Sequence, residues 1–118
     1  KASWAVFVVP SLESGIYSAW QLVKWFEREG VRSKDIPASD LQFFDDGTKG
    51  LLSGFMKIDG VPTKHYLETE LQVIFDEAGF SITAIEKLEY NWTTEFDTPP
   101  KWMGEPYPCD WLIVCGRK

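Results

Sequence analysis

The sequence predicts an α/β fold with one mixed sheet of about three core strands, flanking helices and an additional β-hairpin. Residues 4–9 (WAVFVV) form a near-continuous apolar run, which is typical of a strand that is covered on both faces. Pro10 and Ser11 follow directly, and these residues suit the end of a strand and the start of a helix. A second apolar run, residues 110–115, predicts that the chain ends on a strand.

The first helix is predicted to begin after Ser11 and to end before Gly30. Ser11 is a preferred N-cap residue, and Glu13 places a negative charge in the first turn, where the helix dipole favours an anion. Gly30 is a natural C-cap. Apolar residues recur at helical spacing along this segment, namely Leu12, Ile16, Ala19, Trp20, Val23 and Phe26.

The middle of the chain predicts a connection followed by a hairpin. Residues 31–40 are polar and contain Pro37, so they connect two elements. Residues 41–58 contain Asp-Gly and Lys-Gly steps between two apolar runs, which predicts a β-hairpin over this range. Residues 59–64 are expected to form a second turn.

A second helix is expected to end at Gly79, with Thr63 or His65 as its N-cap. Its apolar stripe consists of Leu67, Leu71, Ile74, Phe75 and Ala78. Phe80 then leads into a long strand whose alternation places one set of side chains on a common face: Ile82, Ala84, Glu86, Leu88 and Tyr90.

A stiff loop rich in proline and aromatic residues separates this strand from the last one. Residues 99–108 cannot form a central strand because proline has no N–H to donate to a sheet. The last strand, residues 110–115, returns after the loop and is therefore expected to run antiparallel to the strand before it. If it lies between two neighbours, both of its faces should be largely buried.

Length and composition fit a single domain over residues 1–118. Apolar residues make up 44% of the chain and aromatic residues 15%, which is too rich for a disordered protein. The net charge is −6 without a basic cluster, so no nucleic-acid partner is expected. The apolar run near the N-terminus is far too short for a membrane span, which predicts a soluble, cytoplasmic protein without a membrane partner.

The two cysteines predict neither a disulfide nor a metal site. Cys109 and Cys115 lie six residues apart, which on a regular strand corresponds to about 20 Å. A disulfide needs Cα atoms within about 7 Å. Two thiols without a second pair or a neighbouring histidine also make a poor metal site. Because the cysteines form neither kind of site, they are expected to be buried and reduced. Asp45, Asp46 and Asp59 lack the spacing of a calcium loop, so no calcium site is expected from them either.

The order of these elements resembles the C-terminal part of class I S-adenosylmethionine-dependent methyltransferases. The resemblance is carried by WAVFVVPSLES (4–14), by the segment DGVPTKHYLETELQVIFDEAGFSITAIEKLEY (59–90) and by DWLIV (110–114). In that family the fifth strand ends in a proline, and a helix with an EL…F…AGF pattern leads into the sixth strand. The seventh strand runs antiparallel between the fifth and the sixth. The resemblance therefore implies the fold of the distal half of a Rossmann-like methyltransferase.

The chain departs from that family in its cofactor motif. It has 9 glycines but no G-x-G turn, and no acidic residue stands where the family contacts the ribose hydroxyls. No S-adenosylmethionine site is therefore expected in this chain, although the cofactor is implied for a complete enzyme. The resemblance implies a substrate-side C-terminal region that is not catalytically complete alone, because the N-terminal cofactor-binding half is absent.

The resemblance also implies a set of substrate-side candidates: Ser11, Glu13, Tyr17, His65, Trp102 and Tyr107. Ser11 and Glu13 follow the carboxyl end of the first strand, where open α/β sheets bind ligands, although helix capping also explains Ser11. His65 is the only histidine and is either a general base or a capping or surface residue. Trp102 and Tyr107 either form a rigid lid or cover the end of the core.

Two classes of function follow. One is a methyltransferase region that contributes to the binding of a small-molecule substrate, and the other is a free-standing α+β interaction module without catalysis. The family's fourth strand has no counterpart, so residues 4–9 would have an unpaired edge. This predicts self-association through that edge, pairing with an N-terminal half, or coverage by the hairpin over residues 41–58.

Overall fold

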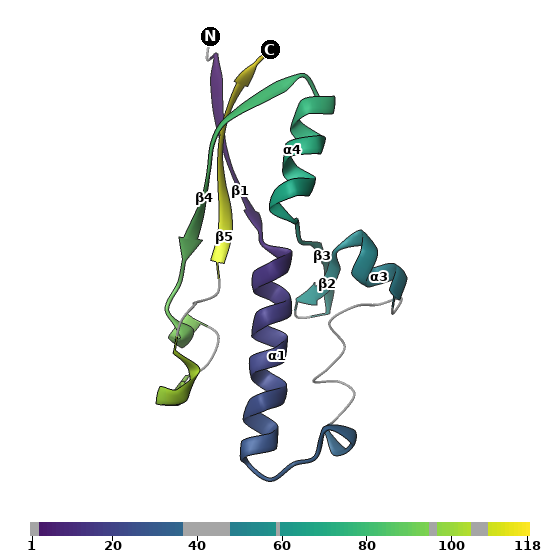
Figure 1. Cartoon of the computed structure of the whole chain (residues 1–118), viewed down its shortest axis with the longest axis vertical. Coiled ribbons are helices and arrows are strands. Elements are labelled where there is room, and N and C mark those ends of the chain that lie inside the picture. The colour runs from purple at the N-terminus through teal and green to yellow at the C-terminus, as the bar shows by residue number, and fades with distance from the viewer. Residues whose placement is uncertain (1–2, 37–47, 59, 95–96, 105–108) are drawn as a thin grey trace.

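The computed structural model describes residues 3–36, 48–58, 60–94, 97–104 and 109–118 (Figure 1). Its helices and strands in chain order are β1 (Trp4–Pro10), α1 (Leu12–Arg28), α3 (Thr48–Ser53), β2 (Phe55–Ile58), β3 (Val61–Lys64), α4 (Glu68–Glu77), β4 (Phe80–Glu89) and β5 (Cys109–Arg117). Three short 3-10 turns complete the described elements: Ser33–Asp35, Trp92–Thr94 and Lys101–Met103.

The main sheet has the strand order β1-β5-β4, and both pairs of neighbouring strands are antiparallel. β1 and β4 run in the same direction but are separated by β5, so no parallel pair of strands occurs in the described sheets. The expected fold class, a mixed sheet as in the distal half of a Rossmann-like methyltransferase, is therefore wrong for this chain. The protein combines a fully antiparallel three-stranded sheet, a separate hairpin and helices.

One face of the sheet is packed against α4 and contains the core. The buried centre consists of Leu71 on α4 and of Trp111 and Ile113 on β5. The rings of Phe7 and Phe75 meet edge to face at 5.3 Å and join β1 to α4. The remaining side chains packed around this centre are partly buried: Val9, Tyr66, Phe75, Ile82 and Ile85.

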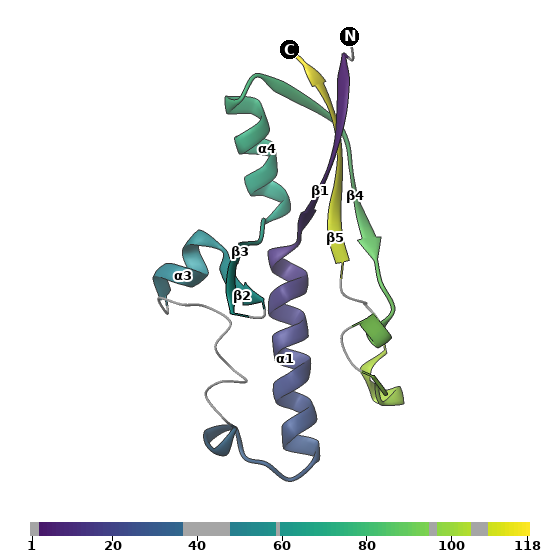
Figure 2. The same ribbon diagram turned by 180° about the vertical axis from the view of Figure 1, so that it is seen from behind.

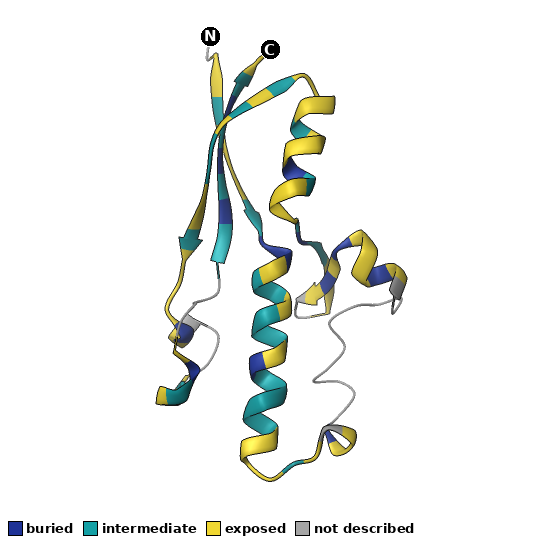
Figure 3. Ribbon diagram, in the orientation of Figure 1, coloured by how far each residue is buried: buried dark blue, intermediate teal, exposed yellow. Residues whose placement is uncertain are grey.

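The opposite face is not covered by any element that the structure describes (Figure 3). Three alternating residues of β1 point to this face and are strongly exposed: Trp4 (64%), Val6 (49%) and Val8 (53%). The expectation that residues 4–9 are covered on both faces is therefore wrong. Leu112 and Val114 of β5 pair with Val8 and Val6 and are only half-buried, so the last strand is fully buried on one face alone.

A β-bulge changes the face that β4 presents. The pairing with β5 shifts register between Ile82 and Ala84, so Ile82 and Ile85 both pack into the core. The sequence pattern predicts Ile82 on the same face as Ala84 and Leu88. This prediction is wrong, because the bulge adds one residue to β4 and so reverses the alternation after Ile82. Tyr90 lies beyond the strand, where its hydroxyl donates to Asp110 at 2.7 Å; this hydrogen bond raises the Tyr90 pKa.

The start of α1 agrees with the sequence pattern. Ser11 is the N-cap, and its side-chain oxygen accepts a hydrogen bond from Ser14. The helix then continues beyond the end of β1 and away from the sheet (Figures 1 and 2). Its predicted buried stripe is partly wrong, since Ile16 is 41% exposed and Trp20 is 50% exposed, whereas the polar Gln21 is buried.

The hairpin lies further along the chain than predicted. Residues 48–53 form α3 instead of a strand, and residues 41–47 lie outside the described residues. β2 pairs antiparallel with β3 around Gly60, which has a φ of 80° that favours glycine. The predicted hairpin over residues 41–58 is therefore wrong, and so is the predicted turn over residues 59–64, most of which form β3.

Leu67 is the N-cap of α4, so neither Thr63 nor His65 has this role. The backbone N–H of Leu67 is instead satisfied by the Glu70 carboxylate, at 3.3 Å from Oε1. Within the predicted stripe of this helix, Leu71 is buried, whereas Leu67 and Ile74 are each 39% exposed. α4 is short and packs on the sheet through one side only, so the residues on its other side are in contact with water.

The molecule is elongated. Its Cα radius of gyration is 16.6 Å, and its extents are 55 × 31 × 21 Å. A compact domain of this length would have a radius of gyration of about 13.5 Å. No described helix has the length and apolar character that are needed to cross a bilayer.

Candidate functional site

The described candidates fall into two groups along α1. Ser11, Glu13 and His65 lie where the end of β1 meets the segment between β3 and α4. Tyr17 lies further along α1, and Trp102 lies beside it in the residues 92–94 and 97–104 that pack against this helix. Tyr107 lies outside the described residues.

The first group begins with the polar contacts of the α1 N-terminus. Ser11 is 2% exposed, and its Oγ accepts from the Ser14 N–H at 3.1 Å. Glu13 accepts from the Glu68 N–H at 3.3 Å and thereby links the first turn of α1 to that of α4. The Leu12 N–H also donates to the Tyr66 carbonyl at 2.9 Å. The Ser11 side chain is therefore used to cap α1, and the Glu13 carboxylate joins α1 to α4.

His65 is packed into the same junction and is only 7% exposed. Its Nδ1 lies 2.9 Å from the Thr63 carbonyl oxygen. A carbonyl only accepts, so Nδ1 carries a proton in this contact. The ring also lies against α1, since a Cβ built on Gly15 would be 3.4 Å from His65 Cδ2. These contacts support a packing role for His65. A general base has to be accessible to the substrate, and His65 is almost completely buried.

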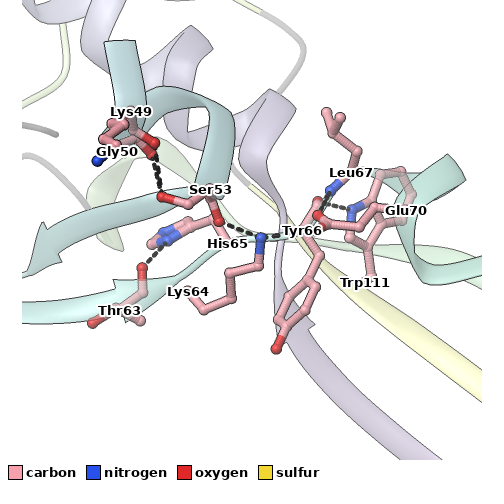
Figure 4. Close-up of polar contacts among 10 residues, drawn as sticks. All are labelled: Lys49, Gly50, Ser53, Thr63, Lys64, His65, Tyr66, Leu67, Glu70 and Trp111. Carbon is pink, nitrogen blue, oxygen red and sulfur yellow. Dashed lines mark hydrogen bonds and ion pairs between the residues drawn. The ribbon is translucent and has the colours of Figure 1, made fainter. Parts of the chain in front are cut away.

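Lys64 connects three elements beside His65 (Figure 4). Its Nζ donates to Glu70 Oε2 at 2.8 Å and also to the Ser53 carbonyl. The same ammonium group lies 5.2 Å from the centre of the Tyr66 ring. Trp111 donates from its indole nitrogen to the Tyr66 carbonyl at 3.0 Å, which ties this junction to the sheet. The Lys64–Glu70 pair is partly buried and is part of the framework that holds α3, β3 and α4 together.

The second group is built around stacked aromatic rings. The Tyr17 ring stacks on Trp20 at 5.8 Å between ring centres and lies 6.1 Å from Trp92. Trp92 is 3% exposed and donates from Nε1 to the Gly104 carbonyl at 2.7 Å. Residues 92–94 and 97–104 are therefore held together and against α1 by aromatic contacts and a partly buried hydrogen bond.

Gln21 lies between α1 and this segment. Its amide nitrogen donates to the Tyr17 hydroxyl at 2.9 Å and to the Met103 carbonyl at 3.1 Å. The side-chain oxygen of Gln21 is buried and has no hydrogen-bond partner in the described part of the chain.

Two cations lie on the tryptophan rings of the second group. Lys24 Nζ is 4.9 Å from the Trp20 ring centre and 5.6 Å from the Trp102 ring centre. The Arg28 guanidinium carbon is 4.4 Å from the Trp102 ring centre. In the described ranges, no carboxylate lies within ion-pair distance of Lys24 or Arg28. The four residues Trp20, Lys24, Arg28 and Trp102 are called the cation–tryptophan site below.

Sequence reasoning identified Tyr17 and Trp102 but missed the other members of the second group. The sequence pattern predicted Trp20 in the buried stripe of the helix. The other missed members of the group are Gln21, Lys24, Arg28 and Trp92. Residues 17, 20, 21, 24 and 28 recur at three- and four-residue intervals, so they share one side of a helix. This mixed aromatic and basic pattern on one side of the helix is the sequence signal that could have indicated the site.

The described residues contain no cluster of three or more His, Cys, Asp or Glu side chains that could hold a metal ion. Both cysteines are free, and only Cys115 is buried. A shallow open hollow lies between α4 and the start of β4, where Asp76 is paired with Lys118. The arrangement in the cation–tryptophan site therefore offers the most distinctive binding chemistry, which consists of ring faces and positive charge.

Comparisons of this chain with family models, with curated proteins and with solved structures find no match.

Proposed function

We propose that this chain is the substrate-side C-terminal region of an S-adenosylmethionine-dependent methyltransferase and is not catalytically complete alone. The position of β5 carries the proposal. The last strand lies between β1 and β4 and runs antiparallel to both. This is the arrangement that the sequence resemblance implies for the last three strands of the family.

The free side of β1 supports the same proposal. In the described sheet β1 pairs only with β5, so its other edge has unpaired backbone groups. The sheet face that includes Trp4, Val6 and Val8 is exposed and apolar. An uncovered apolar surface of this kind lowers the solubility of a protein, so another segment is expected to cover it. An N-terminal half that pairs with β1 would cover both features and would supply the cofactor site.

In this proposal the cation–tryptophan site and the first turns of α1 belong to the substrate side. The carboxyl end of β1 leads directly into Ser11 and α1, and ligands of open α/β sheets bind at such strand ends. The methyl acceptor is a small molecule, the cofactor is bound outside this chain, and the protein is cytoplasmic.

Cofactor binding tests this proposal. Calorimetric titration with S-adenosylmethionine is carried out on this chain and on the complete product of its reading frame. We expect no measurable heat of binding for this chain, because it has no G-x-G turn, and micromolar binding for the complete product. Micromolar binding to this chain would contradict the proposal that the cofactor is bound outside it. A complete product that does not bind the cofactor would overturn the proposal.

A second candidate function is a free-standing interaction module that associates with a copy of itself. The observation that favours it is the apolar edge strand, in which residues 4–9 carry no charge. Two β1 strands pairing edge to edge would extend the sheet and satisfy the unpaired backbone groups of both edges. The sedimentation experiment described in the Discussion tests this alternative.

A further inference from the structure

We propose that the cation–tryptophan site binds a planar carboxylate, of which an aromatic acid is the simplest example. The site consists of Trp20, Lys24 and Arg28 on α1 and Trp102 on the segment that packs against it. Under the proposed function this ligand is the methyl acceptor, and that part of the inference rests on the proposed function. The binding itself depends only on the residues of this chain.

The charge of the site indicates an anionic ligand. Lys24 and Arg28 are one helical turn apart and lie against the same Trp102 ring, so their charges are close to each other. The protein as a whole has a net charge of −6, yet the described residues provide neither cation with a carboxylate partner. A bound carboxylate would relieve the repulsion between the two cations. It would also accept charge-assisted hydrogen bonds, including a bidentate pair from Arg28.

The rings of the site indicate that the ligand is planar. Trp20 is 50% exposed although Tyr17 stacks on it and Lys24 lies over its ring, and Trp102 is half-buried. Aromatic rings favour offset stacking with other planar groups. A carboxylate attached to a ring can therefore contact the cations while the ring packs, offset or edge to face, against the exposed part of Trp20.

The surroundings hold these groups in place. Tyr17 stacks on Trp20, and Gln21 binds both the Tyr17 hydroxyl and the Met103 carbonyl, which is next to Trp102. Trp92 is buried and donates to the carbonyl of Gly104. Because the rings are fixed before a ligand arrives, less conformational entropy is lost on binding.

The experiment is a titration of the folded chain with sodium benzoate and with indole-3-acetate. Binding is followed by NMR through the indole N–H signals of Trp20 and Trp102. Benzamide is the uncharged control of the same shape, and inorganic phosphate is the control without a ring. We expect saturable shifts of both signals with the two carboxylates, and at least tenfold weaker binding of benzamide and of phosphate.

Variants assign the binding to the site. Lys24→Gln and Arg28→Gln are each expected to weaken benzoate binding at least tenfold, whereas Lys24→Arg should retain most of it. Lys34→Gln removes an exposed lysine outside the site and should bind as the parent does. Circular dichroism shows whether each variant is folded, and Lys24→Arg keeps the test valid if Lys24→Gln unfolds.

Four results would overturn the inference. These are no saturable shift with either carboxylate, equal binding of benzamide, equal binding of phosphate, or unchanged benzoate binding in folded Lys24→Gln and Arg28→Gln variants. The last result would mean that the cations only tie residues 101–103 to α1. Failure of the complete product to bind S-adenosylmethionine would leave this inference intact, so the two proposals fail separately.

Discussion

Gly15 is a residue at which two elements approach closely. A Cβ built at this position would lie 2.6 Å from the sulfur of Met56, which is 3% exposed on β2. A glycine in the first turns of a helix costs about 1 kcal/mol relative to alanine. The absence of a side chain is therefore explained by the docking of the β2–β3 hairpin on α1.

The Gly15→Leu variant should therefore be less stable. We expect a loss of about 1–3 kcal/mol in the free energy of unfolding, because the added side chain would displace Met56. Denaturant unfolding of Gly15→Leu, Met56→Ala and the double variant measures the coupling between the two positions. The double variant should be more stable than the sum of the single losses predicts. Additive losses would show that Met56 is not the contact that matters.

At the scale of elements, the two faces of β5 differ in burial. Ile113 is 0% exposed and lies opposite Phe7 and Ile85, whereas its neighbour Leu112 faces the uncovered side and is half-buried. An aspartate at position 113 would be a buried charge without a partner, but one at position 112 would reach water.

Ile113→Asp is therefore expected to lower the free energy of unfolding by more than about 3 kcal/mol and to leave much of the chain unfolded. Leu112→Asp should cost much less, whereas the predicted burial of both faces of the last strand would imply severe losses for both variants. Denaturant unfolding followed by circular dichroism measures the difference. Similar losses for the two variants would mean that both faces of β5 are covered.

The local signals in the sequence were sufficient for some elements. Ser11 and Gly30 bracket α1 because capping depends on neighbouring residues only. The hairpin was misplaced because the Asp-Gly step at 46–47 has the same local signal as the step at 59–60. The bulge after Ile82 and the exposure of Trp20 depend on contacts with other elements, so no pattern within one element predicts them.

The candidate site was predicted in part for the same reason. Tyr17 and Trp102 were identified, but the sequence did not show that Lys24 and Arg28 lie on the Trp102 ring. Trp102 is more than 70 positions away from both cations along the chain. Ser11 and His65 were candidates by position, and the structure places both in packing contacts.

At the scale of the whole molecule, the exposed apolar face predicts self-association. We expect sedimentation of the isolated chain at high concentration to show dimers or larger species. Val8→Lys should reduce this association, and the substitution should be tolerated because Val8 is 53% exposed. Val73→Lys on α4 is the matched control, since Val73 is 54% exposed but lies outside this face.

A parent chain that stays monomeric at every concentration would contradict this prediction. Equal effects of Val8→Lys and Val73→Lys would show that general charge, and not the sheet face, controls association. Reduced association in the Val8→Lys variant alone would place the contact on the face or edge of β1.

The elongated shape has a consequence for how the protein unfolds. The sheet and α4 form the core at one end, whereas the far turns of α1 and residues 92–94 and 97–104 are held together by a separate set of rings. Two separate clusters need not melt together, so unfolding is expected to depart from two-state behaviour. A single melting temperature would then describe the sheet end only, and ligands of the far end would leave it almost unchanged.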